Sequence, residues 1–122
     1  MLKIVVGGQL SKEEVVAAVK AAGGDQVTVE KKTDMAAAMD RKSGAADCYL
    51  GCCQTGGGGS LAMAIALCGY GQCVTLASPG KTMTPAEIAA QVQSGKTCFG
   101  FVPESISAVV PPLVAALLEK KG

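Results

Sequence analysis

Short apolar runs alternate along the chain with longer amphipathic stretches. The apolar runs are typical of strands buried on both faces of a parallel sheet, and they cover residues 2–6, 27–29, 48–52, 73–77 and 97–101. Each run is followed by a helical pattern, and these patterns begin near Ser11, Thr33, Ser60, Thr84 and Pro103. The alternation predicts a single α/β domain over residues 1–122.

The short connections between these elements restrict the topology. They predict a three-layer fold, in which five mostly parallel strands form a sheet with helices on both faces. Among such folds we expect the Rossmann-like or flavodoxin-like strand order 2-1-3-4-5, whose binding crevice lies between strands 1 and 3. In that order, Gly7, Gly8 and Gln9 after the first strand would face the loop after the third strand.

Local signals mark several helix ends. Ser11 with Glu14 has the spacing of a capping box, and Thr84 with Glu87 repeats it around a proline that suits the first helical position. Pro111-Pro112 predicts that the last helix is kinked or divided into two pieces, because proline lacks a backbone N–H.

The chemically distinctive segment is a glycine loop, which we define as Cys52 to Ser60, Cys52-Cys53-Gln54-Thr55-Gly56-Gly57-Gly58-Gly59-Ser60. A glycine loop between a strand and a helix presents free N–H groups and the positive end of the helix dipole to an anion. A flexible turn and close helix packing are the open alternatives. The candidate anion-binding residues are Gly7, Gly8, Gln9, Gln54, Thr55, Gly56, Gly57, Gly58, Gly59, Ser60 and Lys81.

Cys53 is the candidate catalytic residue, because a thiol near a helix amino terminus can have its pKa lowered toward the thiolate form. Its neighbour Cys52 should point to the other face of the sheet, so only one of the pair faces the site. The alternative is that both are small buried hydrophobic residues, as we expect for the other four cysteines. No metal site or cofactor is expected, since the chain has no histidine and no C-x-x-C pair.

Composition narrows the classes of partner. With 49% hydrophobic residues, 17% charged residues and a net charge of +1, the chain resembles a globular protein and lacks the basic stripe of a nucleic-acid binder. Its longest apolar run, Leu61–Cys68, is too short to span a membrane. The start of the chain lacks a secretory signal, so we expect a cytoplasmic protein whose six cysteines are reduced.

Two family resemblances follow from these motifs. Over nearly its whole length the chain resembles the YhfU-like family of small bacterial proteins of unknown function, through Asp34-Met35-Ala36-Ala37-Ala38-Met39, Cys53-Gln54-Thr55-Gly56, Gly69-Tyr70 and Ser78-Pro79-Gly80. The segment from Asp47 to Ala62 is similar to a stretch of the ribose-5-phosphate isomerase B and galactose-6-phosphate isomerase family. In that family an Asp precedes the strand and a Cys-Gly-Thr-Gly-x-Gly-x-Ser run follows it.

The second resemblance implies roles for individual residues. Cys53 matches the cysteine that moves a proton between sugar carbons, and the enediolate-holding loop matches Thr55, Gly56, Gly58 and Ser60. The chain departs from that family in two ways. Gly7-Gly8-Gln9 replaces an Asp-His pair, and no histidine is present to open a sugar ring. The resemblance therefore favours an acyclic substrate over a cyclic pentose phosphate.

Three hypotheses remain at this point. The first is an isomerase-like enzyme of the aldose–ketose type that binds a small anionic metabolite, such as a sugar phosphate, and uses Cys53 as a base. The second is a non-catalytic ligand-binding or regulatory module. The third is a phosphocysteine carrier similar to the IIB domains of sugar phosphotransferase systems, which carry their cysteine loop after strand 1. A homodimer or higher homo-oligomer is expected by analogy with small domains of this type.

Overall fold

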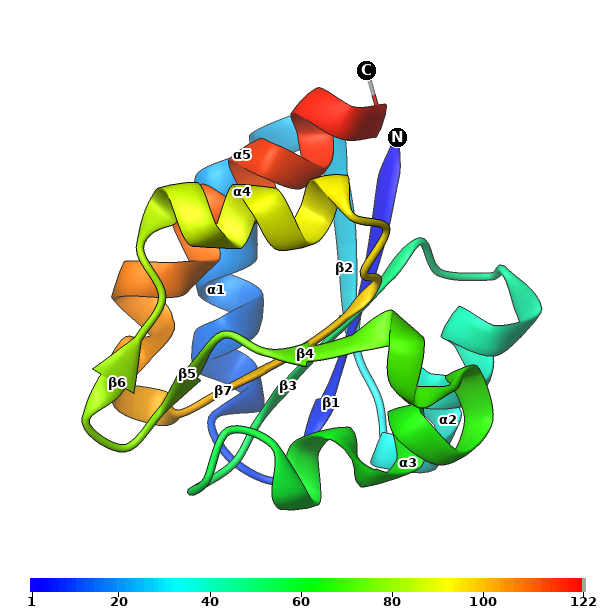
Figure 1. Ribbon diagram of the computed structural model, residues 1–122. Coiled ribbons are helices and arrows are strands. Elements are labelled where there is room, and N and C mark those ends of the chain that lie inside the picture. Colours follow the sequence, from blue (N-terminus) through cyan, green and yellow to red (C-terminus); the bar gives the residue numbers. More distant parts are fainter. Residues whose placement is uncertain (122) are drawn as a thin grey trace.

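The computed structural model describes residues 1–121 and contains a central parallel sheet (Figure 1). Its strand order is β2-β1-β3-β7-β4, and every neighbouring pair is parallel. The strands are β1 (Leu2–Gly8), β2 (Val27–Lys31), β3 (Cys48–Cys52), β4 (Cys73–Thr75) and β7 (Cys98–Phe101). A separate antiparallel hairpin, β5 (Ala77–Ser78) and β6 (Lys81–Thr82), follows β4.

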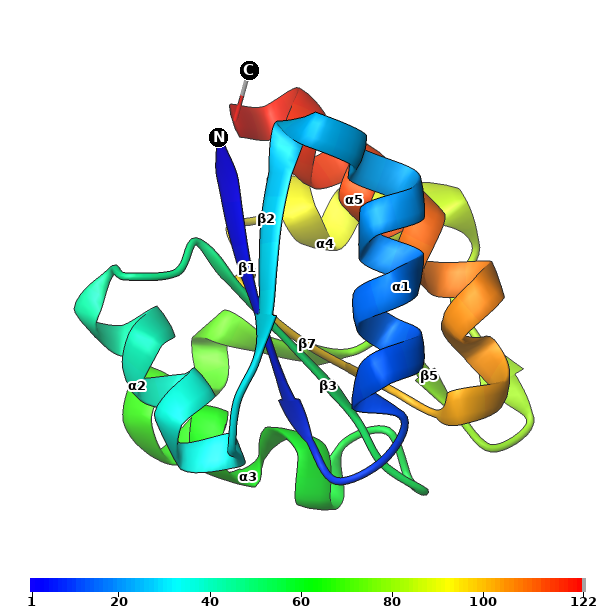
Figure 2. The same cartoon turned by 180° about the vertical axis from the view of Figure 1, so that it is seen from behind.

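Helices cover both faces of the sheet. One face carries α1 (Lys12–Gly23), α4 (Pro85–Gln93) and α5 (Ile106–Lys121), and the other carries α2 (Asp34–Ser43) and α3 (Gly58–Cys68) (Figure 2). Three short 3-10 turns complete the secondary structure: η1 (Gly24–Gln26), η2 (Tyr70–Gln72) and η3 (Pro103–Ser105). Within residues 1–121, no helix combines the length and the apolar character needed to cross a bilayer.

The predicted three-layer α/β class is confirmed, but the predicted order 2-1-3-4-5 is wrong for the last two strands. The fifth strand in sequence, β7, lies between β3 and β4. All four residues of β7 are buried, whereas two of the three residues of β4 are only half-buried. The more apolar strand therefore takes the inner position, and α4 returns the chain on the face that also carries α1.

The core is divided by the sheet into two hydrophobic clusters. Successive strand residues point to opposite faces, so Leu50 packs with α1 and α5 while its neighbour Tyr49 packs under α2 and α3. Phe99 and Phe101 fill the first cluster, and Leu61 of α3 belongs to the second. This alternation places side chains of β3 beneath the glycine loop.

Two local predictions have different outcomes. Thr84 forms the predicted capping box: its hydroxyl accepts from Glu87 N at 3.2 Å, and the Glu87 carboxylate accepts from Thr84 N at 2.9 Å. The capping box predicted at Ser11 is wrong, because Ser11 has a left-handed backbone with φ 55° and makes no side-chain cap bond. The chain leaves β1 through a tight turn in which Gln9 N and Leu10 N both donate to Cys52 O, and this turn sets the backbone conformation of Ser11.

The two prolines lie inside one helix instead of dividing it. Pro111 and Pro112 are within α5, and their missing N–H groups leave the carbonyls of Ser107 and Ala108 without helical partners. Ser107 and Ala108 are both exposed, so water can replace the lost hydrogen bonds. The helix continues because Val109, Val110, Leu113 and Val114 are buried against the sheet and α1.

Candidate functional site

The carboxyl ends of β1 and β3 lie side by side, as the sequence predicts. Gly8 pairs in register with Cys52, and the N–H groups of Gln9 and Leu10 both donate to Cys52 O, at 2.9 and 3.1 Å. Gly8 has φ 83°, and a Cβ there would lie 2.4 Å from Cys52 N. Connections leave β1 and β3 toward opposite faces, so this is the point where an open α/β sheet forms its crevice.

Parts of the glycine loop pack closely against the rest of the protein. Gly56 has φ 84°, and a Cβ on it would lie 2.0 Å from Ala77 O in the β5–β6 hairpin. A Cβ on Gly57 would lie 2.8 Å from Thr75 Oγ1, and a Cβ on Gly59 would lie 2.6 Å from Gln9 Oε1. Close packing therefore explains three of the four glycines, and it brings Gln9 over the start of α3.

The backbone N–H groups of the loop are only partly used. Gly58 N donates to Thr55 Oγ1 at 3.1 Å, and Leu61 N donates to Gly57 O at 3.1 Å. The N–H groups of Gly56, Gly57 and Gly59 donate to no group in the described part of the chain. Three donors at the positive end of α3 are thus available to an anion.

Cys53 lies below the first turn of α3, and its side chain is 3% exposed. Burial raises the pKa of the Cys53 thiol, but hydrogen bonding from Ser60 and Thr55, through side chains and backbone, outweighs it and lowers the pKa to about 6. Thr55 Oγ1 is 3.5 Å from the sulfur. The thiolate is therefore the main form of Cys53 at neutral pH.

Cys52, the neighbour of Cys53 in the chain, lies on the other face of the sheet. It packs in the hydrophobic cluster on the α1 and α5 face, and burial raises its pKa to about 12. Cys53 is consequently the cysteine of the pair that lies under α3. The pKa of the Cys48 thiol is likewise raised by burial to about 12, and burial also raises the pKa values of Cys73 and Cys98.

Ser60 and Tyr49 connect the site to the core. Ser60 is completely buried, and its hydroxyl oxygen has no hydrogen-bond partner among residues 1–121, so the hydroxyl can turn toward the thiolate. Tyr49 OH donates to Ser60 O at 2.5 Å, and it lies against Gly7 of β1, where a Cβ would be 2.8 Å from the hydroxyl oxygen. Tyr49 thereby ties the first turn of α3 to the end of β1. Tyr49 was not among the residues predicted from the sequence, although a single tyrosine in an otherwise apolar strand indicates a buried hydroxyl.

Lys81 lies on β6, in the hairpin that begins at Ala77 beside Gly56. Its side chain is exposed. The pKa of the Glu87 carboxyl is lowered by hydrogen bonds from Thr84 and, more weakly, by the charge of Lys81. The structure therefore places Lys81 near the start of α4, while Gln54 and Thr55 lie on the loop itself. Within residues 1–121, no three acidic, cysteine or histidine side chains converge in a way that could hold a metal ion.

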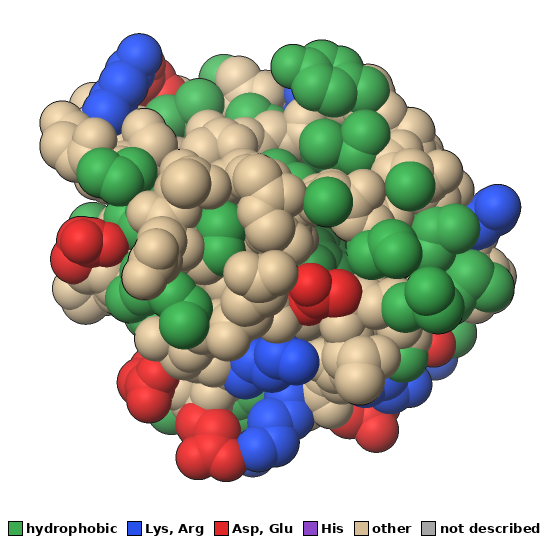
Figure 3. All heavy atoms as spheres, turned by 90° about the horizontal axis from the view of Figure 1, so that it is seen from below, with side chains coloured by type: hydrophobic (Ala, Val, Ile, Leu, Met, Phe, Trp, Pro, Cys, Tyr) green, Lys and Arg blue, Asp and Glu red, His purple; other side chains and the backbone are tan. Residues whose placement is uncertain are grey.

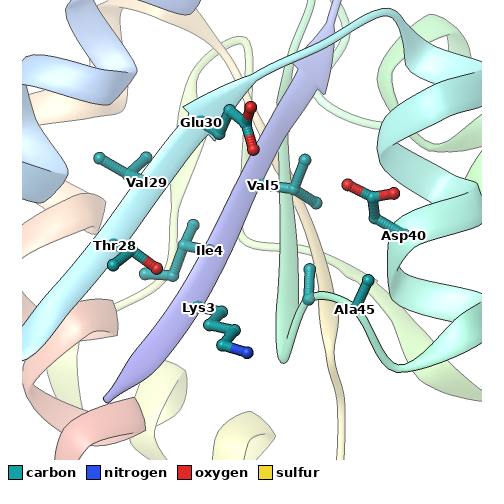
Figure 4. Close-up of a pocket in the computed structure, with 9 residues that line it drawn as sticks. Lys3, Ile4, Val5, Thr28, Val29, Glu30, Asp40 and Ala45 are labelled. Carbon is teal, nitrogen blue, oxygen red and sulfur yellow. The ribbon is translucent and has the colours of Figure 1, made fainter.

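Two pockets of about 240 Å³ each flank the sheet, and only one of them borders the glycine loop. One lies over β1 and β2 beside α2, toward the amino ends of the strands and away from the glycine loop (Figure 4). Its polar lining includes Lys3, Glu30 and Asp40, and Asp40 is already paired with Lys32. The other is a groove beside α3 that begins at Gly57.

Comparison with known proteins gives a consistent result. The model of a family described as "Protein of unknown function DUF2620" matches residues 2–117. The chain is 38% identical over 114 residues to "Uncharacterized protein YhfU" of Escherichia coli strain K12, covering 93% of this chain and 97% of that protein. The protein of the same name from Shigella flexneri gives the same values. No solved structure matches the chain significantly.

Proposed function

The chain belongs to the family of proteins of unknown function DUF2620, and from that premise we propose that it binds a small organic anion at the glycine loop. We further propose that Cys53 acts there as the base of an isomerase-like proton transfer. The observation that carries the proposal is a thiol with a pKa of about 6 at the amino end of α3, beside N–H groups that have no partner in residues 1–121.

The electrostatics of the loop support proton transfer. No lysine or arginine belongs to the glycine loop, so hydrogen bonds alone lower the pKa of Cys53. A base with a pKa near 6 is largely unprotonated at neutral pH, and its conjugate acid can still return the proton. A buried cysteine that served only for packing would have a raised pKa, as Cys48 and Cys52 do.

The reaction that fits is a proton shift next to a carbonyl group. The Cys53 thiolate takes a proton from the carbon beside the carbonyl: the C–H bond breaks, an S–H bond forms, and the electron pair moves onto the carbonyl oxygen. The neutral thiol then returns the proton to the former carbonyl carbon. At the same time the hydroxyl proton on the first carbon moves to the former carbonyl oxygen, so the carbonyl and hydroxyl groups exchange places and the thiolate is restored. The chain has no histidine for ring opening, so the substrate class is an acyclic hydroxycarbonyl compound with a phosphate or carboxylate group.

The same groups can stabilise the negative oxygen of the intermediate. Once Cys53 is protonated, its sulfur is a weaker hydrogen-bond acceptor, and the Ser60 hydroxyl is released to a new partner. The N–H groups of Gly56, Gly57 and Gly59 are the other available donors. Donors fixed in advance at the position where charge develops are the usual source of such stabilisation.

A non-catalytic ligand-binding module is the second candidate, and the burial of Cys53 favours it. With 3% of its surface exposed and Gly56 packed against Ala77, the sulfur is reached only if the loop moves. If the protein is such a module, the Cys53 thiolate helps to shape the glycine loop that binds the anion, and no proton is transferred.

The first experiment measures whether the Cys53 thiol is ionised at neutral pH and whether a bound anion protects it from a reagent. Iodoacetamide should label the Cys53 peptide with a pH midpoint near 6, and inorganic phosphate or dihydroxyacetone phosphate should slow the labelling. Exchange of carbon-bound hydrogen for deuterium in dihydroxyacetone phosphate, followed by NMR, then tests the proton transfer itself.

Two variants separate the candidates. Cys53→Ser keeps a small polar side chain and should retain phosphate binding in a thermal-shift assay while losing deuterium exchange. Gly59→Val places a branched side chain where Gln9 lies and should lose binding. Protection by phosphate without any deuterium exchange would favour the binding module. A pH midpoint of Cys53 labelling near the ordinary thiol value of 9.0 would overturn the enzyme proposal.

A further inference from the structure

A groove runs from the start of α3 along the edge of the sheet. It has a volume of about 240 Å³ and lies between α3 and the edge strand β4. Its lining is largely apolar and contains no charged side chain, and it includes Gly57, Leu61, Ile65, Tyr70, Val74 and Thr75. Viewed from the side of the glycine loop, hydrophobic side chains gather on the half of the molecule where α2 and α3 lie (Figure 3).

The groove is continuous with the proposed anion site. Gly57 is both the N-cap residue of α3 and one end of the groove lining, and its N–H has no partner in residues 1–121. Three residues, Gln54–Gly56, separate Gly57 from Cys53 along the loop. From Gly57 the groove continues along α3, past Leu61 and toward Tyr70.

A second observation concerns the first turn of α3, beside the start of the groove. The Ser60 hydroxyl is fully buried on the first turn of α3 and has no partner among the described residues, although buried hydroxyls are normally hydrogen-bonded. Ser60 also lies close enough to Cys53 to lower the pKa of that thiol. The Cys53 sulfur is thus the only polar side-chain group that the described residues offer to the Ser60 hydroxyl, and both lie at the start of α3, where the apolar groove begins.

We propose that the anion bound by the glycine loop carries a flat apolar substituent, such as an aryl group, which lies in the groove between α3 and β4. This inference rests on the proposed function and names its substrate class more narrowly. A cavity of about 150 Å³ accommodates one benzene ring in a protein core, so a groove of about 240 Å³ holds a single ring with room to spare.

Tyr70 is the residue that an aryl substituent would contact at the outer end. Its side chain is 78% exposed, so the ring has an apolar face available for contact. A ring in the groove would cover Leu61, Ile65 and the face of Tyr70 together. A bare sugar phosphate offers only hydroxyl groups to these side chains and would leave their surface wet.

The test compares two probes that share a phosphate group. Labelling of the Cys53 peptide by iodoacetamide is followed at neutral pH in the presence of inorganic phosphate or phenyl phosphate. We expect phenyl phosphate to protect at a concentration about tenfold lower, as burial of a ring against apolar side chains predicts. Cys73 also lines the groove, and burial raises the pKa of its thiol. A change in the labelling of Cys73 by a probe therefore reports that the probe blocks the groove.

Tyr70 is exposed, so substitutions there should not disturb folding, and changes in protection of Cys53 then report on the groove. Tyr70→Ala should remove most of the advantage of phenyl phosphate without affecting protection by inorganic phosphate, and Tyr70→Phe should keep the advantage. Met35→Ala, at another exposed hydrophobic side chain on α2, is the matched control and should change nothing.

The outcomes distinguish this inference from the proposed function. If both probes protect equally, or if phenyl phosphate keeps its advantage in Tyr70→Ala, the aryl substituent is not in the groove and the inference is overturned. The proposed anion site stands in both cases. If neither probe protects Cys53, both the inference and the anion site fail.

Discussion

At the scale of single residues, the site depends on a thiolate stabilised by hydrogen bonds alone. Hydrogen bonds from Ser60 and Thr55 overcome the burial of the sulfur and bring the pKa of Cys53 to about 6. Such bonds are directional, so they last only while the loop keeps its native conformation. The charge of Cys53 is therefore coupled to folding, and the coupling has a measurable pH dependence.

Stability should rise with pH between about 6 and 9 because of Cys53. In this window the native thiol is ionised while the unfolded thiol, with its ordinary value of 9.0, is still protonated, so the unfolded state binds more protons. The contribution is present above pH 9 and is lost as the pH falls through 6. We expect the free energy of unfolding to rise by about 1–2 kcal/mol across the window, reduced from the full linkage value by solvent screening at the loop.

Urea unfolding at several pH values measures this rise. Other groups also titrate, so the comparison is the difference between the wild-type chain and Cys53→Ser at each pH. That difference should grow with pH, whereas a constant difference would mean that the native pKa of Cys53 is not lowered.

Gly56 should tolerate substitution least among the glycines of the loop. Gly56→Ala places a Cβ 2.0 Å from Ala77 O at a φ of 84°, so both the hairpin and the loop backbone must move. We expect a loss of about 2–4 kcal/mol in urea unfolding. Gly71→Ala is the matched control, because nothing lies within 4 Å of its Cβ position and its φ is not positive, and it should cost less than about 0.5 kcal/mol. Equal costs for the two variants would contradict the close packing of the loop.

At the scale of elements, the position of α3 decides the chemistry of Cys53. Gly51 of β3 leaves space for the first turn, since a Cβ there would lie 2.7 Å from Ser60 O. Tyr49 OH fixes the same carbonyl from below. The helix is therefore held at its amino end by a small residue and a buried hydroxyl from one strand, which brings Ser60 to Cys53.

Tyr49→Phe should loosen this attachment. The substitution keeps the ring but leaves Ser60 O without its donor, at an expected cost of about 1–2 kcal/mol in stability. The first turn of α3 should then shift, and the pKa of Cys53 should rise above 6 in a thiolate titration. Tyr70→Phe removes the hydroxyl of the exposed tyrosine and should leave both quantities unchanged. An unchanged pKa in Tyr49→Phe would show that Tyr49 serves packing only.

The elements also show what sequence patterns can and cannot predict. Apolar runs placed all five sheet strands, because burial on both faces leaves a continuous hydrophobic signature. The order of β4 and β7 was missed, since it depends on the relative burial of two similar runs. Ser11 and Glu14 have the residue types of a capping box, but Ser11 lacks the backbone conformation that a capping box needs, because the turn after β1 sets the φ of Ser11. Cys53 was predicted from its position, and its role stays a prediction, whereas Tyr49 makes contacts that only the fold creates.

At the scale of the whole molecule, access to the site depends on a region at the margin of the sheet. Cys53 is 3% exposed, and the loop above it is closed by the contact between Gly56 and Ala77. Ala77 begins a hairpin of two strands with two residues each, outside the main sheet. Short segments with few hydrogen bonds open more readily than a paired central strand. We therefore expect opening of the hairpin to control how fast reagents reach Cys53.

Weakening the hairpin turn should expose Cys53 without altering it. Gly80 has φ 77° with open space around its Cβ position, so Gly80→Ala strains the turn by about 1 kcal/mol and adds no clash. Iodoacetamide should then label Cys53 about fivefold faster. Gly95→Ala imposes a similar strain at φ 103° in the connection before β7, away from the hairpin, and should leave the rate unchanged. If the two variants accelerate labelling equally, access arises from general unfolding, and the hairpin does not control entry to the site.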